Sequence, residues 1–177
     1  MLLSNASILK CIAQKQIEFN PQFDPAKLGP VGVRVHLGSE LLIPQAGQTI
    51  DFEKKSDIRY DKHDLLNGDY LFKPGDFILA TTVEQIKTGS ELMPFLDGRS
   101  TLARLGMTIY NTALLLDGPS NEWNKPVLEV KNHGNFDIRL TFRMPIGMIS
   151  FIRVSAPIIK GEIKSRYSLP GSIMPLL

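Results

Sequence analysis

The sequence has one cysteine, almost no excess charge and no long hydrophobic run. Cys11 has no second cysteine to pair with, which excludes a disulfide framework of the kind found in small secreted proteins. The 20 basic and 18 acidic side chains leave a net charge of +2, without the basic stripe of a nucleic-acid-binding protein. No apolar stretch reaches membrane-spanning length, and the N-terminus lacks the pattern of a signal peptide. We therefore expect a cytoplasmic protein that binds neither nucleic acid nor a membrane.

The length and the apolar content predict one globular domain. The chain has 177 residues, of which 43% are hydrophobic and 21% charged, as in proteins that bury a sizeable core. We therefore expect residues 1–177 to form a single domain. The tail over residues 164–177 contains Pro170, Gly171 and Pro175 and has little periodicity. Such a tail is either disordered or ordered over a ligand or a neighbouring subunit.

Hydrophobic periodicity predicts one helix followed by many strands. Ile8 and Ile12 lie four residues apart behind a capping Ser4, which favours a helix over residues 4–15. Apolar stretches predict strands over residues 31–37, 77–83, 107–116, 127–132, 136–143 and 148–154, the fourth and fifth forming a hairpin around His133-Gly134-Asn135. Lys73-Pro74-Gly75-Asp76 predicts a tight turn, and residues 51–68 a polar excursion. These features favour a mainly β sandwich or distorted barrel.

The segment Asp97–Gly106, with the sequence DGRSTLARLG, concentrates groups that bind anions. Arg99 and Arg104 carry rigid forks of donors that suit phosphate oxygens. Ser100 and Thr101 can cap a short helix and leave backbone N–H groups directed at an anion. The alternative is a capped surface helix with two solvated arginines, and the local chemistry leaves both interpretations open.

With this segment placed among strands, the chain resembles the dCTP deaminases of the trimeric dUTPase superfamily. That family usually has Asp/Glu-Gly-Arg-Ser-Ser-Leu-Ala-Arg-Leu-Gly where this chain has residues 97–106. Further matches occur in the expected order at Leu3-Ser4, residues 35–38, Pro74-Gly75, residues 80–84, Thr112-Ala113, Asp117, Leu128-Glu129 and Arg166-Tyr167. The resemblance implies a dUTPase-like distorted β-barrel or jelly roll with a short N-terminal helix and few other short helices.

The resemblance implies hydrolytic deamination of dCTP to dUTP and ammonia without zinc. Zinc deaminases need a His-x-Glu and a Pro-Cys-x-x-Cys, which one cysteine cannot supply. Glu129 lies between apolar residues on a predicted strand and matches the family's proton shuttle. Ser100 and the carbonyl group of Ala113 match the groups that hold the attacking water. The alternative for Glu129 is a solvated strand glutamate that faces Lys131.

The resemblance also implies a set of substrate-binding residues. The triphosphate would contact the side chains of Arg99, Ser100, Thr101, Arg104 and Arg166 and the backbone of Leu102 and Ala103, with bracing of Glu129 as a second role for Arg104. Asp117 would contact the deoxyribose 3′-hydroxyl, although Asp117 is also a good turn former. The backbone of Val127 and Leu128 would face the base. Magnesium would arrive on the triphosphate, with no metal site of the protein's own. The family assembles as a homotrimer with active sites between subunits.

The sequence departs from the family outside the phosphate motif. Arg34 and His36 occupy positions where the family usually has aspartate and arginine, and Leu114-Leu115 replaces a usual His-Arg pair. The loop over residues 118–127 is also longer. The intact phosphate motif predicts nucleotide binding, and three activities stay open. They are dCTP deamination, hydrolysis of dUTP alone or after deamination, and nucleotide binding without catalysis.

Overall fold

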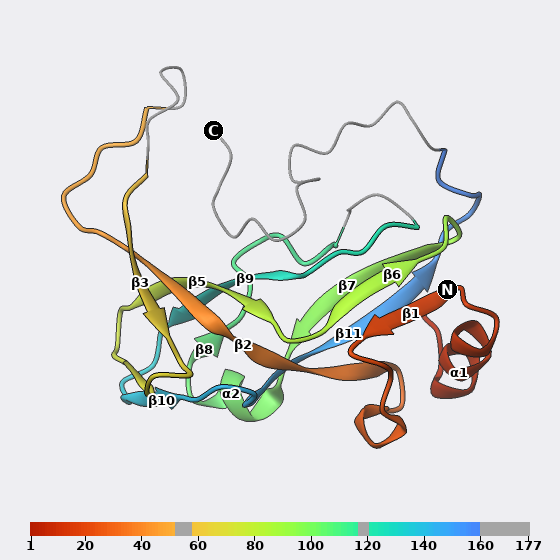
Figure 1. Ribbon diagram of the computed structural model, residues 1–177, viewed down its shortest axis with the longest axis horizontal. Helices are drawn as coiled ribbons and strands as arrows, with labels where there is room; N and C mark the ends of the chain where they lie inside the picture. The colour runs from red at the N-terminus through yellow and green to blue at the C-terminus, as the bar shows by residue number, and fades with distance from the viewer. Residues whose placement is uncertain (52–57, 117–120, 160–177) are drawn as a thin grey trace.

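The computed structural model describes residues 1–51, 58–116 and 121–159, and strands dominate these ranges (Figure 1). In chain order the elements are α1 (Asn5–Ala13), β1 (Ile17–Asn20), the 3-10 helix η1 (Pro25–Lys27), β2 (Gly32–Pro44), β3 (Tyr60–Asp64), β4 (Tyr70–Phe72), β5 (Phe77–Thr82), β6 (Gln85–Thr88), β7 (Leu92–Gly98), α2 (Ser100–Arg104), β8 (Met107–Thr108), β9 (Val127–Asn132), β10 (Ile138–Leu140) and β11 (Pro145–Arg153). The predicted mainly β fold is confirmed. Within the described ranges, no helix combines the length and the apolarity needed to cross a membrane.

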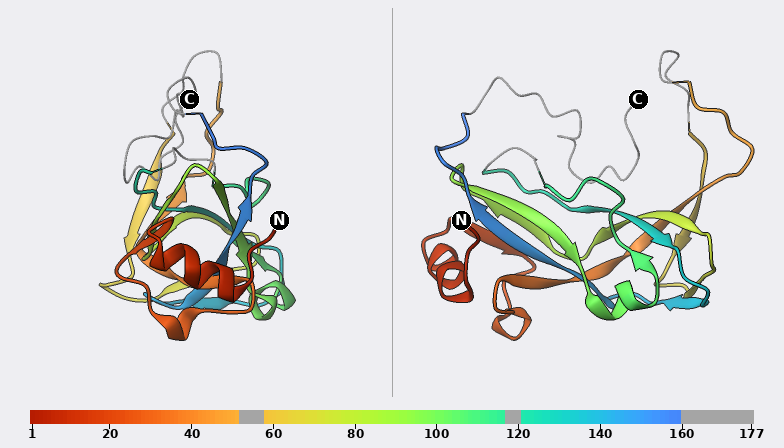
Figure 2. Two further views of the ribbon diagram at one scale, coloured as in Figure 1. Left: turned by 90° about the vertical axis from the view of Figure 1, so that its right-hand side faces the viewer. Right: turned by 180° about the vertical axis from the view of Figure 1, so that it is seen from behind.

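The largest sheet has seven strands and carries the candidate site. Its strands follow the order β7-β11-β2-β5-β9-β8, and β3 pairs with β2 beside this path. Two smaller sheets pair β1 with β6 and β10 with β4. All of these pairings are antiparallel. Figure 2 shows that the strands curve into the expected distorted barrel, and buried apolar side chains form its core.

Apolar side chains from the strands and from α1 fill this interior. Val33, Val35 and Leu37 are buried along β2, whereas Arg34 between them is exposed, which confirms the predicted alternation. Strand β5 is buried along almost its whole length, as expected for a strand covered on both faces. Ile8 on α1 is fully buried, and α1 covers the end of the barrel near β1 (Figure 1).

The predicted helix and the predicted tight turn both form. The Ser4 hydroxyl caps α1 by accepting a hydrogen bond from the Ser7 N–H. The helix ends at Ala13 rather than at residue 15, because Lys15 adopts a left-handed φ of 55°. In the turn, the Asp76 N–H donates to the Lys73 carbonyl oxygen at 3.0 Å, and Gly75 has a φ of 88°.

The predicted hairpin between residues 127–132 and 136–143 is wrong. β9 pairs with β5 and β8, and β10 pairs with β4. The buried amide of Asn132 explains the difference, since its Nδ2 donates to the carbonyl oxygens of Phe72 at 3.0 Å and Phe136 at 2.9 Å. These two bonds direct the chain away from β9 and towards β4.

Two other segments differ from the prediction. Residues 107–116 change pairing partner partway along, and residues 51–68 contain a strand that was not expected. The expected strand over residues 107–116 is regular only at β8, because the segment first pairs with β9 and then meets β7 through a single bridge between Phe95 and Leu115. The expected excursion over residues 51–68 contains β3, which pairs with residues 40–44 of β2. Its polar composition is that of an exposed edge strand. Residues 52–57 lie outside the described part of the chain.

Candidate active site

The segment Asp97–Gly106 forms the end of β7 and the whole of α2. The N-cap of α2 is Arg99, whose backbone is extended (φ −95°, ψ 134°) and whose side chain makes no capping hydrogen bond. The prediction that Ser100 and Thr101 cap the helix is therefore wrong. Both residues are already helical, and a cap must precede the first helical residue. The N–H groups of the first turn have no acceptor inside the helix and remain able to bind an anion.

The helix α2 buries one apolar side chain and leaves its polar face in solvent. Leu102 is 7% exposed and anchors the helix in the core. The exposed residues of the helix are Ser100, Thr101, Ala103 and Arg104. Arg99 is half-buried, and its Nη1 donates to the carbonyl oxygen of Pro145 at 3.2 Å, which holds this side chain against the start of β11.

Two glycines let the end of α2 approach the end of β9. Gly106 has a φ of 82°, and a Cβ added there would lie 2.5 Å from the Cα of Gly134. A Cβ on Gly134 would lie 2.0 Å from the carbonyl oxygen of Leu105. The His133 N–H donates to the Gly106 carbonyl oxygen at 2.8 Å, which locks the contact. The phosphate motif and the strand that carries Glu129 are therefore fixed to one another.

Glu129 lies on the half-buried face of β9. Its neighbours Leu128 and Val130 are fully buried on the core side, as the sequence predicts. The Glu129 N–H donates to the Ile109 carbonyl oxygen at 3.1 Å, and its Oε2 accepts a hydrogen bond from the Asn111 N–H at 3.1 Å. A backbone amide thus orients this carboxylate and leaves its other oxygen available.

Lys131 lies on the same half-buried face of β9 as Glu129, but the two side chains do not form an ion pair. The Lys131 Nζ donates to the carbonyl oxygen of Gly75 instead. Among the described residues, the only hydrogen-bond partner of the Glu129 side chain is Asn111, and no hydrogen bond or ion pair joins Glu129 to Ser100 or Arg104. Asn111 cannot be identified from the sequence, because a backbone donor leaves no signature in the side-chain pattern.

The segment over residues 109–116 connects Glu129 to the phosphate motif. Its first part lies beside Glu129 through the bonds to Ile109 and Asn111. Its last part lies beside β7, where the Leu96 N–H donates to the Leu114 carbonyl oxygen at 2.8 Å. Ala113 is exposed between these two contacts. The carbonyl group predicted to hold water therefore lies on the stretch that joins the two halves of the site.

The first residue of β9 leaves its backbone unpaired on one side. Along a strand, successive N–H and C=O groups point to alternate sides. The N–H and C=O groups of Val127 point away from β5, to the same side as those of Glu129. On that side the Glu129 N–H is bonded to Ile109, but the Val127 groups have no partner among the described residues. The corresponding groups of Leu128 point towards β5. Val127 is thus better placed than Leu128 to present backbone groups to a ligand.

Two predicted substrate-binding residues, Asp117 and Arg166, lie outside the described residues, as does the tail over residues 164–177. The described residues contain no group of three histidine, cysteine, aspartate or glutamate side chains that could together hold a metal ion.

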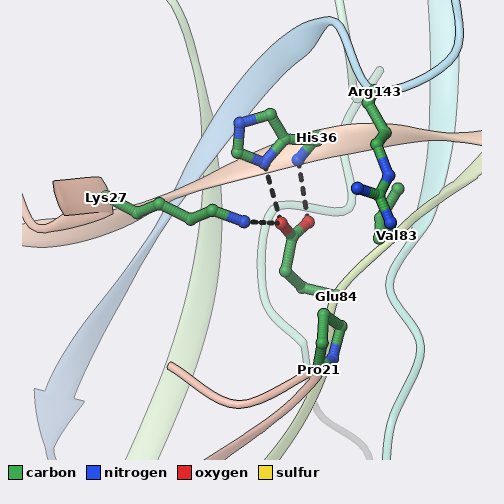
Figure 3. A pocket seen from close by; sticks show the side chains of 6 residues that line it. All are labelled: Pro21, Lys27, His36, Val83, Glu84 and Arg143. Atoms are coloured by element: carbon green, nitrogen blue, oxygen red, sulfur yellow. Dashed lines mark hydrogen bonds and ion pairs between the residues drawn. The ribbon is translucent and has the colours of Figure 1, made fainter. Parts of the chain in front are cut away.

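A second polar cluster surrounds Glu84, immediately after β5 (Figure 3). The Glu84 side chain is 4% exposed. Its Oε1 accepts hydrogen bonds from the Lys27 Nζ at 2.9 Å and the His36 Nδ1 at 2.7 Å, and its Oε2 accepts one from the His36 N–H at 2.8 Å. A cavity of about 310 Å³ lies here, lined by Pro21, Lys27, His36, Val83, Glu84 and Arg143.

The donors around Glu84 keep its carboxylate charged. Burial acts to raise the pKa of Glu84, but the hydrogen bonds from Lys27 and from the backbone and side chain of His36 outweigh burial and lower the pKa below its ordinary 4.5. The cluster ties η1, β2 and the β5–β6 connection together. In the sequence, His36 and Glu84 are distinguished only as positions compared with the family. A sequence signal for this cluster is a glutamate close after a strand that is buried on both faces, since such a carboxylate needs hydrogen-bond donors nearby.

Comparison with known proteins places these features in one family. The family model described as dCTP deaminase-like matches residues 2–154. A dCTP deaminase from Shewanella loihica is 31% identical over 172 residues, covering 90% of this chain and 87% of that protein. A protein from Dictyoglomus turgidum named dCTP deaminase, dUMP-forming, is 28% identical over 162 residues, covering 89% of this chain and 82% of that protein.

A solved structure shares the fold. The 2′-deoxycytidine 5′-triphosphate deaminase from Agrobacterium tumefaciens superposes with a TM-score of 0.63 at 16% sequence identity. The match covers 84% of this chain but 47% of the other, so this chain spans about half the length of that structure. At this identity the likeness concerns the fold alone.

Proposed function

This chain belongs to the dCTP deaminase-like family, and on that premise we propose that it deaminates dCTP hydrolytically to dUTP and ammonia. The observation that carries the proposal is the environment of Glu129, a half-buried carboxylate held by one backbone donor beside the segment that leads to the phosphate motif. We propose a zinc-independent reaction, because the sequence lacks the cysteine pair of the zinc deaminases.

Glu129 acts as the proton shuttle. Its carboxylate takes a proton from a water molecule that attacks C4 of the cytosine ring, and this attack forms a C–O bond at C4. Glu129 passes this proton to N3, then takes the remaining proton from the new C4 hydroxyl and passes it to the exocyclic amine. The C4–N4 bond breaks, and ammonia leaves as the C4 carbonyl group forms. The hydrogen bond from the Asn111 N–H orients the carboxylate throughout these transfers.

Ser100 and the carbonyl group of Ala113 hold the attacking water. Ser100 is exposed at the first turn of α2, and Ala113 is exposed on the segment that also carries Asn111. Holding the water in a fixed position removes part of the entropic cost of the attack. Arg104, exposed at the other end of α2, either binds the triphosphate or braces Glu129 when substrate is present.

The phosphate motif binds the triphosphate. Arg99, Thr101 and Arg104 supply side-chain donors, and Leu102 supplies a backbone N–H group at the start of α2. The Ala103 N–H already donates to the Arg99 carbonyl oxygen at 2.9 Å. Arg166 reaches the phosphates from the tail. Magnesium enters on the triphosphate, since Mg²⁺ usually binds through substrate phosphates. When bound, the ion neutralises charge on the phosphate oxygens.

The remaining contacts select the nucleoside. We assign the 3′-hydroxyl to Asp117 and the edge of the base to the backbone of Val127, because the backbone groups of Leu128 point towards β5. Support for this assignment comes from the unpaired N–H and C=O groups of Val127, which can form a pair of hydrogen bonds with the base.

We also propose that the protein is a cytoplasmic homotrimer whose sites lie between subunits. Support for an interface comes from large apolar side chains that the isolated chain leaves in solvent around the site. They are Leu114, Leu115, Trp123 and Val127, which are 39%, 50%, 41% and 37% exposed. Large apolar side chains left in solvent are typical of a surface that a partner covers.

The test is a product assay with the full-length protein. Incubation with dCTP and Mg²⁺ should release ammonia and dUTP, without pyrophosphate, whereas dUTP should remain unchanged. Neither product from either nucleotide would contradict the proposal and favour binding without catalysis.

A second activity is kept because two relatives, both from Dictyoglomus, are named dUMP-forming. If this chain shares that property, dCTP should yield ammonia and pyrophosphate together, and dUTP alone should yield pyrophosphate. The same assay therefore separates the deaminase from the enzyme that goes on to hydrolyse its product.

A further inference from the structure

The cavity beside Glu84 contains more positive than negative charge. Lys27 and Arg143 are cationic, Glu84 is anionic, and these three groups leave one net positive charge in the cavity before His36 is counted. The Glu84 carboxylate does not need a donor from a ligand, because both of its oxygens already accept hydrogen bonds. The groups left over are donors. The Lys27 ammonium has two more hydrogens, and the Arg143 guanidinium carries five.

Arg143 is the unusual member of this set. It lies in the turn Thr141–Met144, which is closed by a hydrogen bond of 3.1 Å from the Met144 N–H to the Thr141 carbonyl oxygen. Its φ of 63° is left-handed, a conformation that this turn position normally assigns to glycine. Its guanidinium lies 5.4 Å from the Phe142 ring centroid, and no carboxylate of the described residues pairs with it. A strained arginine without an anionic partner at the wall of a cavity points to a ligand.

Figure 3 shows the guanidinium of Arg143 on one side of the Glu84 carboxylate and the Lys27 ammonium on the other. We propose that this cavity is a second binding site, which takes a small oxyanion, a phosphate or a carboxylate, between Arg143 and Lys27. Arginine binds both kinds of oxyanion through parallel N–H bonds. The volume of about 310 Å³ has room for about ten water-sized groups, enough for a phosphate ion or a small carboxylic acid with bridging waters. The proposal does not depend on the deaminase activity.

The experiment is a titration of the ¹⁵N-labelled full-length protein with inorganic phosphate and, separately, with acetate. The reporters are the amide signals of His36, Val83 and Arg143. Either anion should shift these signals with saturation, and the stronger of the two identifies the preferred oxyanion. The variant Arg143→Asn should weaken the binding roughly tenfold or more, since charged hydrogen bonds are lost. Asparagine tolerates a positive φ, so the turn is preserved.

Two control variants make the outcome specific. Arg139→Asn removes an exposed arginine of the neighbouring β10 that pairs with Asp69 at 3.5 Å outside the cavity, and it should leave the affinity unchanged. Arg104→Gln should also leave the anion-induced shifts of these three signals unchanged, because binding of phosphate at the α2 segment is independent of binding in the cavity. The proposal is overturned if neither anion shifts the reporters, if Arg143→Asn binds as tightly as the unaltered protein, or if Arg104→Gln abolishes the shifts.

Discussion

Two glutamates near the same pair of strands have opposite surroundings. Glu129 on β9 is half-buried, and a single backbone N–H contacts its carboxylate. Glu84, just after the neighbouring β5, is 4% exposed and accepts three hydrogen bonds, two of them from side chains that can carry positive charge. Among the described residues, the first carboxylate has unused acceptor positions, whereas the second has its charge balanced and both of its oxygens occupied.

We propose that this difference reflects two roles, proton transfer for Glu129 and stabilisation of the fold for Glu84. A proton shuttle must bind and release a proton in each turnover, so its two protonation states must be close in free energy. The donors around Glu84 favour the charged state and lower the pKa of Glu84. We therefore expect substitution of Glu129 to affect the reaction and substitution of Glu84 to affect stability.

The largest effect is expected for Glu129→Gln. The amide keeps the shape of the side chain but cannot accept and return a proton, so ammonia release from dCTP should fall by about 10²- to 10⁴-fold. Binding of dCTP should persist, because the phosphate motif is untouched. Steady-state ammonia release and equilibrium dCTP binding measure the two quantities.

The matched control is Glu40→Gln, which alters an exposed strand glutamate that pairs with Lys62 at 3.5 Å. This variant should retain full turnover. Unchanged turnover in Glu129→Gln would refute the assignment of the proton shuttle.

A large effect on stability is expected for Glu84→Ala. Removing the carboxylate leaves Lys27 and His36 without their shared acceptor, and breaking such a buried pair costs about 3 kcal/mol of unfolding free energy. Urea unfolding measures this loss. The control Glu18→Ala removes a partly exposed ion pair with Lys87 and should cost about 1 kcal/mol or less. Equal losses in the two variants would mean that burial adds nothing to the Glu84 cluster.

A smaller effect is expected from pH, because the pKa of Glu84 in the folded protein lies below the ordinary 4.5. A lowered carboxyl pKa stabilises the fold above the unfolded value, and this stability is lost as the pH falls through the folded value. The stability advantage of the unaltered protein over Glu84→Gln should therefore be constant near neutral pH and shrink below pH 4.5. Urea midpoints of both proteins across this range provide the measurement, and an advantage that persists unchanged in acid would contradict it.

The sequence predicts elements whose signal is local and misses those that depend on distant partners. The Ser4 cap, the turn at Gly75 and the alternation along β2 all follow from neighbouring residues, and all three form. The hairpin after β9 fails because the amide of Asn132 binds the carbonyl oxygen of Phe72, sixty residues away in the chain. No short window of sequence contains that contact.

The same distinction applies to the two sites. The alternation around Glu129 on β9 can be predicted from its apolar neighbours, and the strand forms as expected. Its backbone partner Asn111 comes from a segment whose path depends on both β9 and β7. The Glu84 cluster gathers side chains from three separate elements, so only the folded chain brings its donors together.

The smallest effect is expected for Arg143→Gly. A left-handed φ costs a non-glycine residue about 1–2 kcal/mol, and glycine removes this strain. Because the greater freedom of glycine in the unfolded chain offsets part of the gain, the free energy of unfolding should rise by up to about 1 kcal/mol. The control Lys15→Gly relieves a similar φ of 55° at the end of α1, away from the cavity, and should gain about as much. The two variants should differ in anion binding, which only Arg143→Gly should lose. A loss of stability in Arg143→Gly would mean that the side chain, through its contact with Phe142, supports the fold, and the strain would then need no ligand to explain it.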